Sequence, residues 1–295
     1  MERIVDYALK ALLYEVAATP KPGLVDRSNN GAHDDMDFYT FLDSTVGLRH
    51  YFSAIVHYIK ERYKITTKSM AIPKGIYLSG DEIFSGLKEL GQQAEVDMKQ
   101  VTKGINTHKG AIYALGLLVA AATETLIVDK SVEGDALIAK MAQRVTAYVG
   151  PSLHKEFEKN AHTKAYGISQ YKDYGMLGAR GEAYTGFKTV RKFGLPMFEE
   201  ALRDGLSVND AMIHALMAII IALEDSNVIG RHNVAVLKES QLKAHEILQA
   251  GGMKTEDGRR LVEAYDRWCI THRISHGGSA DLVAVTVFMY WIKSN

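Results

Sequence analysis

The sequence predicts an all-α protein: a single compact catalytic domain over residues 1–295, with about ten helices and a site built from the loops between them. Three observations predict this class. Apolar residues recur every three or four positions through most of the chain. Only five prolines interrupt it. No run alternates apolar and polar residues between turn signals, as a half-buried strand would.

The helical spacing can be followed along the chain in order. Apolar stripes run through 5–16, 38–59 and 112–122, and each would place its members on one face of a helix. The prolines fall between segments with this spacing, where they interrupt no helix. The further segments are 81–101, 133–149, 181–191, 207–225, 229–250, 255–273 and 279–292.

Charge and cysteine content narrow the classes of partner. The 35 basic residues balance 35 acidic ones, so we expect no nucleic-acid partner, which would require a positive field. A single cysteine, Cys269, excludes an intramolecular disulfide and a multi-cysteine zinc site. The apolar stretch 215–223 is too short to span a bilayer, and the first residues lack a signal-peptide pattern. We therefore expect a cytoplasmic protein without a membrane partner.

Five polar, glycine-containing loops separate the predicted helices. Helical proteins usually keep their connections short, and loops carry function more often than helix interiors do. We therefore expect the chemistry in these loops, which span 19–36, 104–110, 175–186, 225–233 and 275–281.

The first loop, with the following residues, reads TPKPGLVDRSNNGAHDDMD and concentrates carboxylates. Prolines on both sides stiffen the backbone around Lys21. Asp26, Asp35 and Asp37 would repel one another unless a cation lay among them, and Mg²⁺ prefers such oxygen ligands. The alternative is a solvated acidic turn in which Asp37 caps the next helix.

The second loop leads into GINTHKGA, where a helix is predicted to begin near His108. Thr107 is placed to cap it, so that Lys109 and the free amides of the first turn would face one spot. A helix N-terminus beside a lysine is a ready anion site. The alternative is an ordinary capped helix with an exposed lysine.

The third loop contains GARGEA, in which glycines flank Arg180. The planar guanidinium of an arginine suits phosphate recognition because it binds two oxygens at once. Glu182, predicted to begin a helix, could act as a base or stabilise a developing cation. A structural ion pair between Arg180 and Glu182 is the alternative.

The fourth loop, within LEDSNVIGRHN, combines two acids with a cation. Glu224 and Asp225 are predicted to end an apolar helix, where negative charge opposes the helix dipole. A metal ion or a cationic partner would offset that cost. The alternative is a pair of solvated acids screened by Arg231.

The fifth loop leads into the last predicted helix through GGSADL. The two glycines permit a close approach, Ser279 is placed to cap the helix, and Asp281 lies in its first turn, where its charge suits the dipole. That placement has a complete structural explanation. The functional explanation is that the amides of the Gly-Gly-Ser segment make a second contact with a phosphate or a ribose.

Together these motifs resemble the triphosphoribosyl-dephospho-coenzyme A synthase family, which supplies the prosthetic-group precursor of citrate lyase and malonate decarboxylase. The resemblance runs nearly end to end and in one order: TPKPGLVD with NNGAHDDMD, GINTHKGA, GARGEA, EDSN with Arg231, and GGSADL. Two positions depart from the pattern. His276 stands where the family has proline, and Ser226 stands where threonine is common, and neither changes a charged group.

The resemblance implies a pentosyltransferase that joins ATP to 3′-dephospho-coenzyme A, giving 2′-(5″-triphosphoribosyl)-3′-dephospho-coenzyme A. The ribose 2′-hydroxyl of the dephospho-coenzyme attacks C1′ of the ATP ribose, and adenine leaves. Mg²⁺ with lysine and arginine would hold the triphosphate, and a carboxylate would stabilise the oxocarbenium-like ribose. The product would pass to a holo-acyl-carrier-protein synthase step, and a homodimer is one possible assembly.

The implied roles divide the candidate residues into three sets. Glu182 is the candidate general base or ribosyl-cation stabiliser, with His108 and Asp281 as the other catalytic candidates. The candidates for binding ATP and phosphate are Lys21, Lys109, Arg180, Arg231 and Ser279. The candidates for binding Mg²⁺ are Asp35 and Asp225, followed by Asp37, Glu224 and Asp26.

Other readings of the acidic loop remain open. The run from Asp34 to Asp37 is similar to the aspartate-rich turn of prenyl-diphosphate enzymes, and His33 with Asp34 resembles a metal phosphohydrolase pair. Here, however, the pattern is DDxD before a helix, without a second acidic motif. A non-catalytic scaffold for a carrier protein is a third reading. Release of adenine from ATP separates the transferase from both enzyme readings, and a rise in melting temperature with ATP and Mg²⁺ separates it from the scaffold.

Overall fold

A computed structural model describes residues 1–67, 75–159 and 178–294 of the chain. Within these residues the regular structure is helical, and no strand occurs, which confirms the predicted all-α class. The helices pack around one continuous cluster of buried apolar side chains, so the fold is a single compact domain.

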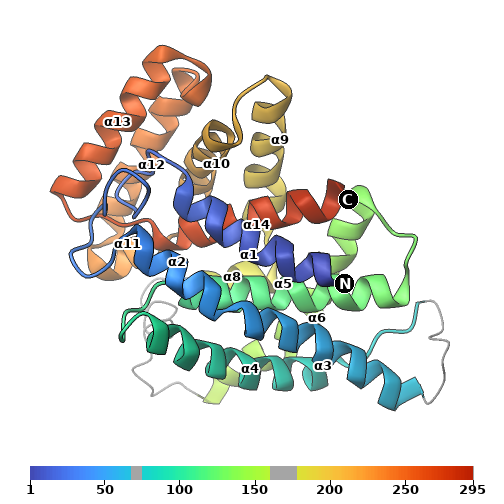
Figure 1. Ribbon diagram of the computed structural model, residues 1–295. Coiled ribbons are helices and arrows are strands. Elements are labelled where there is room, and N and C mark those ends of the chain that lie inside the picture. The colour runs from blue at the N-terminus through green and yellow to red at the C-terminus, as the bar shows by residue number, and fades with distance from the viewer. Residues whose placement is uncertain (68–74, 160–177, 295) are drawn as a thin grey trace.

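The helices follow one another in chain order from the N-terminus to the C-terminus (Figure 1). The first part of the chain contains α1 (Glu2–Ala17), α2 (Phe38–Gly47), α3 (Arg49–Thr67), α4 (Gly80–Val101), α5 (Lys109–Val128) and α6 (Gly134–Lys159). The second part contains α8 (Gly178–Tyr184), a π-helical turn η1 (Val190–Gly194), α9 (Leu195–Arg203), α10 (Val208–Ala222), α11 (Ser226–Arg231), α12 (Val234–Gln249), a 3₁₀ turn η2 (Gly252–Lys254), α13 (Glu256–Thr271) and α14 (Gly277–Ser294).

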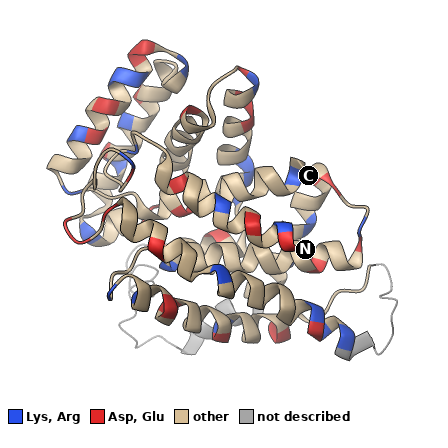
Figure 2. Cartoon of the chain, in the orientation of Figure 1, with Lys and Arg blue, Asp and Glu red and all other residues tan. Residues whose placement is uncertain are grey.

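Helices α5 and α14 form the centre of the molecule. They contact each other, α5 packs against α3, α4 and α6, and α14 packs against α1 and α10. Figure 2 shows that charges of both signs are spread over the surrounding helices, whereas α5 and α14 are largely uncharged. By length and composition α5 could cross a membrane, which the sequence analysis did not anticipate, but 83% of its most apolar window is buried. Packing inside the core accounts for that composition.

The expected helix boundaries were wrong in several places. The stripe at 38–59 forms two helices that meet at Leu48, and the short helices α9 and α11 were not expected. Helix α6 continues through Pro151, and Pro196 lies in the first turn of α9. The first turn tolerates proline because its N–H groups have no partner within the helix. The segment 181–191 is also divided, between α8 and η1.

The helix N-termini position the site. The first residues of α5, α8, α11 and α14 meet one another, and the end of α1 and the loop before α2 complete the enclosure. Each of the four N-termini, of α5, α8, α11 and α14, presents backbone N–H groups that lack a partner within the helix, so these ends favour negative charge.

Candidate active site

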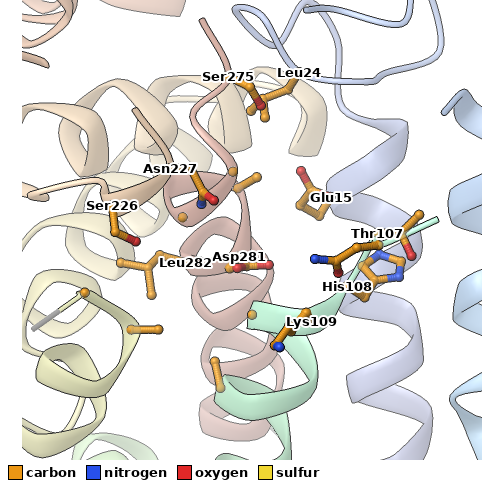
Figure 3. Close-up of a pocket in the computed structure, with 18 of the residues that line it drawn as sticks. Glu15, Leu24, Thr107, His108, Lys109, Ser226, Asn227, Ser275, Asp281 and Leu282 are labelled. Atoms are coloured by element: carbon orange, nitrogen blue, oxygen red, sulfur yellow. The ribbon is translucent and has the colours of Figure 1, made fainter. Parts of the chain in front are cut away.

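A cavity of about 280 Å³, which we call the central cavity, opens where these helix N-termini meet (Figure 3). All five predicted loops contribute residues to its wall. The ionisable residues among its described lining are Glu15, Glu182, Glu224, Asp281, Lys21, Lys109, Arg231, His33 and His108.

Asp281 is the fifth residue of α14, one position beyond the first turn in which the sequence placed it, and it lies half-buried in the middle of this cavity (Figure 3). Its carboxylate lies against Gly110 at the start of α5, where a Cβ would overlap Oδ2. Burial, together with the negative charges of Glu15 and Asp225, raises the pKa of Asp281 well above its usual range, although a hydrogen bond from the Ala111 amide opposes this. A carboxyl group that retains its proton can act as an acid.

Glu15, near the end of α1, pairs with Lys21, and both side chains are almost completely buried. Burial raises the pKa of Glu15, and the ammonium of Lys21 partly opposes this rise. The sequence analysis missed Glu15, although the signal was present. Glu15 lies three residues after Leu12 and four after Ala11, on the buried face of α1.

Asp225 joins two helices at their N-termini. Its carboxylate accepts hydrogen bonds from the Asn227 amide in α11 (3.0 Å) and from both the amide (2.8 Å) and the hydroxyl (2.9 Å) of Ser279 in α14. The expectation that Asp225 ends an apolar helix was wrong, because α10 ends at Ala222 and Asp225 caps α11. Its charge therefore lies at the favourable end of a helix dipole.

The carboxylate of Asp225 also requires its neighbours to be small. A Cβ at Gly278 would lie 2.9 Å from Asp225 Oδ1, closer than ordinary contacts allow. Ser279 is not the helix cap that the sequence predicted, because α14 begins at Gly277 and the Ser279 hydroxyl binds Asp225. Glu224, by contrast, is exposed and lines the central cavity.

The other candidate metal ligands lie apart from one another. Asp26 is buried and accepts hydrogen bonds within its own loop, from the amides of Lys21 (2.9 Å) and Ser28 (2.6 Å) among others. Asp35 is exposed, with Oδ1 3.7 Å from His33 Nδ1. Asp37 caps α2, as the alternative reading proposed. Among the described residues, no three His, Cys, Asp or Glu side chains are grouped to hold a metal ion.

His108 lies directly before α5 and is buried at the cavity wall. Its Nδ1 is 2.7 Å from the Ser44 hydroxyl, while its buried Nε2 has no hydrogen-bond partner in the described part of the chain. Thr107 donates to Ser44 (2.7 Å) and so does not cap α5 as expected. Burial, reinforced by the charge of Lys21, lowers the pKa of His108 to about 3, so its imidazole is neutral at pH 7.

Helix α8 contains both Arg180 and Glu182, so the expectation of a glycine-bent loop around Arg180 was wrong. Glu182 lines the central cavity and accepts hydrogen bonds from the hydroxyl (2.6 Å) and the amide (3.2 Å) of Thr189. Burial raises the pKa of Glu182, and these bonds partly oppose the rise. Arg180 lines a neighbouring cavity, together with Lys109.

Lys109 and Arg231 are the exposed cations of the central cavity. Lys109 is the first residue of α5, whose N-terminus has no side-chain cap among the described residues, and its Nζ lies 3.2 Å from Glu95 Oε2. Arg231 ends α11, near His33. Burial first, and then the charge of Arg231, lower the pKa of His33, whose Nε2 is 2.9 Å from the Ser275 hydroxyl. Cations and free helix amides in one enclosure can bind phosphate groups.

Two relatives of the chain share a name. A protein of Escherichia fergusonii, named 2-(5''-triphosphoribosyl)-3'-dephosphocoenzyme-A synthase, is 33% identical over 286 residues, which is 97% of this chain and 89% of the relative. A protein of Lactiplantibacillus plantarum with the same name, qualified as probable, is 36% identical over 287 residues, covering 97% and 95% of the two chains. No solved structure matches the chain. The model of the CitG family, ATP:dephospho-CoA triphosphoribosyl transferase, matches residues 1–295, and the chain belongs to this family.

Proposed function

We propose that this chain joins ATP to 3′-dephospho-coenzyme A, forming 2′-(5″-triphosphoribosyl)-3′-dephospho-coenzyme A and releasing adenine. The observation that carries the proposal is the central cavity, where the cations Lys109 and Arg231 share one enclosure with the carboxyl groups of Glu182 and Asp281. Membership of the family supplies the reaction, and the cavity supplies the residue types that this reaction needs.

The reaction breaks the C1′–N9 bond of ATP and forms a bond between C1′ and the 2′-oxygen of the dephospho-coenzyme. Adenine keeps the electron pair of the broken bond and takes up a proton, while the attacking hydroxyl loses one. The ribose carries positive charge in the transition state. The site must therefore provide an acid, a base and a negative charge close to C1′.

Asp281 and Glu182 supply these functions in the proposed mechanism. Asp281, which its surroundings keep protonated to higher pH than an ordinary aspartate, donates the proton to adenine. Glu182, whose orientation is fixed by Thr189, accepts the hydroxyl proton and stabilises the ribosyl cation. The neutral imidazole of His108 offers Nε2 as a hydrogen-bonding group rather than a cationic acid.

Lys109, Arg231 and the amides at the start of α5 bind the triphosphate in this proposal. The donor chemistry of the cavity fits Mg²⁺, which usually takes one or two carboxylates together with phosphate oxygens and water. Glu224, which is exposed in the cavity, is the residue that would hold it. Asp225 and Asp26 already accept several hydrogen bonds each, so we assign both to positioning the backbone. The ion would neutralise charge on the triphosphate.

The deciding experiment is incubation with ATP, Mg²⁺ and 3′-dephospho-coenzyme A, followed by mass spectrometry. We expect free adenine and a product whose mass equals the two substrates minus adenine. Formation of ADP or inorganic phosphate without adenine would overturn the proposal and favour the phosphohydrolase alternative. Turnover of a prenyl diphosphate in place of ATP would favour the other alternative.

The cellular setting follows from the same reaction. We propose that the enzyme is cytoplasmic, where ATP is available, and that its product passes to a holo-acyl-carrier-protein synthase step serving citrate lyase or malonate decarboxylase. We also propose a homodimer, which native mass spectrometry would detect as twice the 32.7 kDa chain.

A further inference from the structure

A second cavity, of about 360 Å³, lies among α3, α4, α5, α6 and α8, and we call it the side cavity. It adjoins the central cavity, because Lys109, Gly110 and Ala179 line both. The proposed reaction brings together two large substrates, whereas the central cavity measures only about 280 Å³. Parts of the substrates that do not react therefore need a place outside it.

The two cavities differ in chemistry. The floor of the side cavity is apolar and includes Phe84, Leu87 and Ile112, while its described cations are Lys88, Lys109 and Arg180. Glu95, whose Oε2 is 3.2 Å from Lys109 Nζ, is the one carboxylate among the described lining of the side cavity. The described lining of the central cavity, in contrast, contains the carboxyl groups of Glu15, Glu182, Glu224 and Asp281.

We propose that the side cavity binds the diphosphate and pantetheine part of 3′-dephospho-coenzyme A, an inference that rests on the proposed function. The pantetheine arm is long and uncharged, so it fits an apolar floor, and the diphosphate next to it fits a rim of lysine and arginine. A triphosphate with Mg²⁺ needs carboxylate ligands, which the central cavity provides and the side cavity lacks among its described residues, apart from Glu95.

Gly110 lies at the border of the two cavities, because it lines both of them. It has no side chain, and Asp281 occupies the space that a Cβ would fill. A ribose attached to a diphosphate in the side cavity would pass Gly110 and enter the central cavity beside Asp281. This route carries the 2′-hydroxyl toward the carboxyl groups that the mechanism uses. It also assigns Arg180 to the dephospho-coenzyme rather than to ATP.

Gly91 offers a way to fill the side cavity without disturbing the core. It lies in the interior of α4, where, among the residues that the structure describes, a Cβ would meet only the Tyr51 hydroxyl, at 3.8 Å. A larger residue there suits the helix better than glycine does. We expect Gly91→Phe to fold and to raise the KM for dephospho-coenzyme A by about tenfold or more, with the KM for ATP nearly unchanged. Val96→Phe, at an exposed position of the same helix outside both cavities, is the matched control.

Lys88 tests the charged rim separately. Lys88→Gln removes one cation from the side cavity, and we expect the KM for dephospho-coenzyme A to rise about tenfold. Lys99→Gln, in the last turn of α4 and outside both cavities, is the matched control for charge. In addition, 4′-phosphopantetheine should inhibit the wild-type enzyme competitively against dephospho-coenzyme A and not against ATP.

The outcomes separate this inference from the function on which it rests. If wild type releases adenine but Gly91→Phe and Lys88→Gln raise the KM for ATP instead, or raise neither, the inference is wrong and the function stands. If wild type releases no adenine, the function is wrong, and calorimetric titration with dephospho-coenzyme A then decides the inference. Binding to wild type that Gly91→Phe weakens and Val96→Phe preserves would support the side cavity as a site for this compound. Equal binding to all three would overturn it.

Discussion

The carboxyl groups of the central cavity have different surroundings, and these differences assign their roles. Asp281 faces the negative charges of Glu15 and Asp225, whereas the oxygens of Glu182 face two donors from Thr189. Two carboxyl groups in unlike environments can act as acid and base in one reaction. Lys21 supplies a compensating positive charge, which its pairing with Glu15 holds at the cavity wall.

Glu182→Gln tests the base. The amide keeps the size of the side chain but cannot take up the hydroxyl proton, so we expect kcat to fall by about 10²–10⁴-fold. The KM values for both substrates should change much less, because the variant keeps the cations that bind phosphate. Steady-state kinetics of adenine release would measure the effect, and a kcat near that of wild type would contradict the assignment.

Asp281→Asn tests the acid and has a defined pH dependence. The pKa of Asp281 is higher in the folded protein than in the unfolded chain. Its contribution to the free energy of unfolding is therefore complete at a pH below the unfolded pKa, and it is lost as the pH rises through the folded pKa. Asparagine cannot ionise, so the free energy of unfolding of the variant should fall less than that of wild type as the pH rises. Its kcat should be lower by about 10²–10⁴-fold. Melting curves and kcat across pH would measure both, and unchanged kcat would rule out a role as the acid.

The pair of Glu15 and Lys21 can be tested by a double-mutant cycle. Lys21→Met leaves a buried carboxylate without its partner and should destabilise the fold by about 3–5 kcal/mol. Adding Glu15→Gln removes that uncompensated charge and should recover much of the loss, as urea unfolding would show. A double variant as unstable as Lys21→Met would contradict a direct pairing. If the double variant kept the wild-type KM for ATP, Lys21 would not be a phosphate ligand.

At the scale of elements, the site depends on how α11 and α14 are joined. Asp225 accepts hydrogen bonds from both helices, so its removal takes away the N-cap of α11 and the contact that holds α14 to it. We expect Asp225→Ala to destabilise the fold by about 2 kcal/mol or more, measured by urea unfolding. Asp37→Ala, which removes the exposed cap of α2 alone, should cost about 1 kcal/mol. Equal losses in the two variants would mean that Asp225 acts only as a local cap.

The elements also show what could be predicted from sequence. Long helices such as α4 and α13 were predicted closely, because apolar spacing over many residues leaves no other face to bury. Helices α9 and α11 were missed because nine and six residues are too few to establish a period. The same shortness concealed that Asp225 caps a helix. Its partner Ser279 is 54 residues away, and no local pattern contains such a contact.

At the scale of the whole molecule, loop position was predicted better than side-chain role. The five loops were chosen for their polar, glycine-containing sequences, and the fold brings residues from all of them to one cavity. Which side chains enter that cavity depends on packing between distant segments. Asp26 turns into its own loop, and Arg180 faces the side cavity, although both stand in motifs as polar as those of Glu224 and Asp281.

The helices that enclose the central cavity come from both ends of the chain, so a ligand bound there should stabilise the whole fold. ATP with Mg²⁺ at 100 times its Kd should add about 2.7 kcal/mol and raise the melting temperature. Removing the metal with a chelator should abolish most of this shift, because the triphosphate charge would then face Glu224 and Glu182 without compensation.

Glu224→Gln tests the residue that would hold the metal. In this variant the rise in melting temperature with ATP should depend less on Mg²⁺, and Glu239→Gln, on α12 outside both cavities, is the control. An equal shift with and without Mg²⁺ would contradict a metal-assisted site, and no shift at any ATP concentration would favour a scaffold that binds no nucleotide.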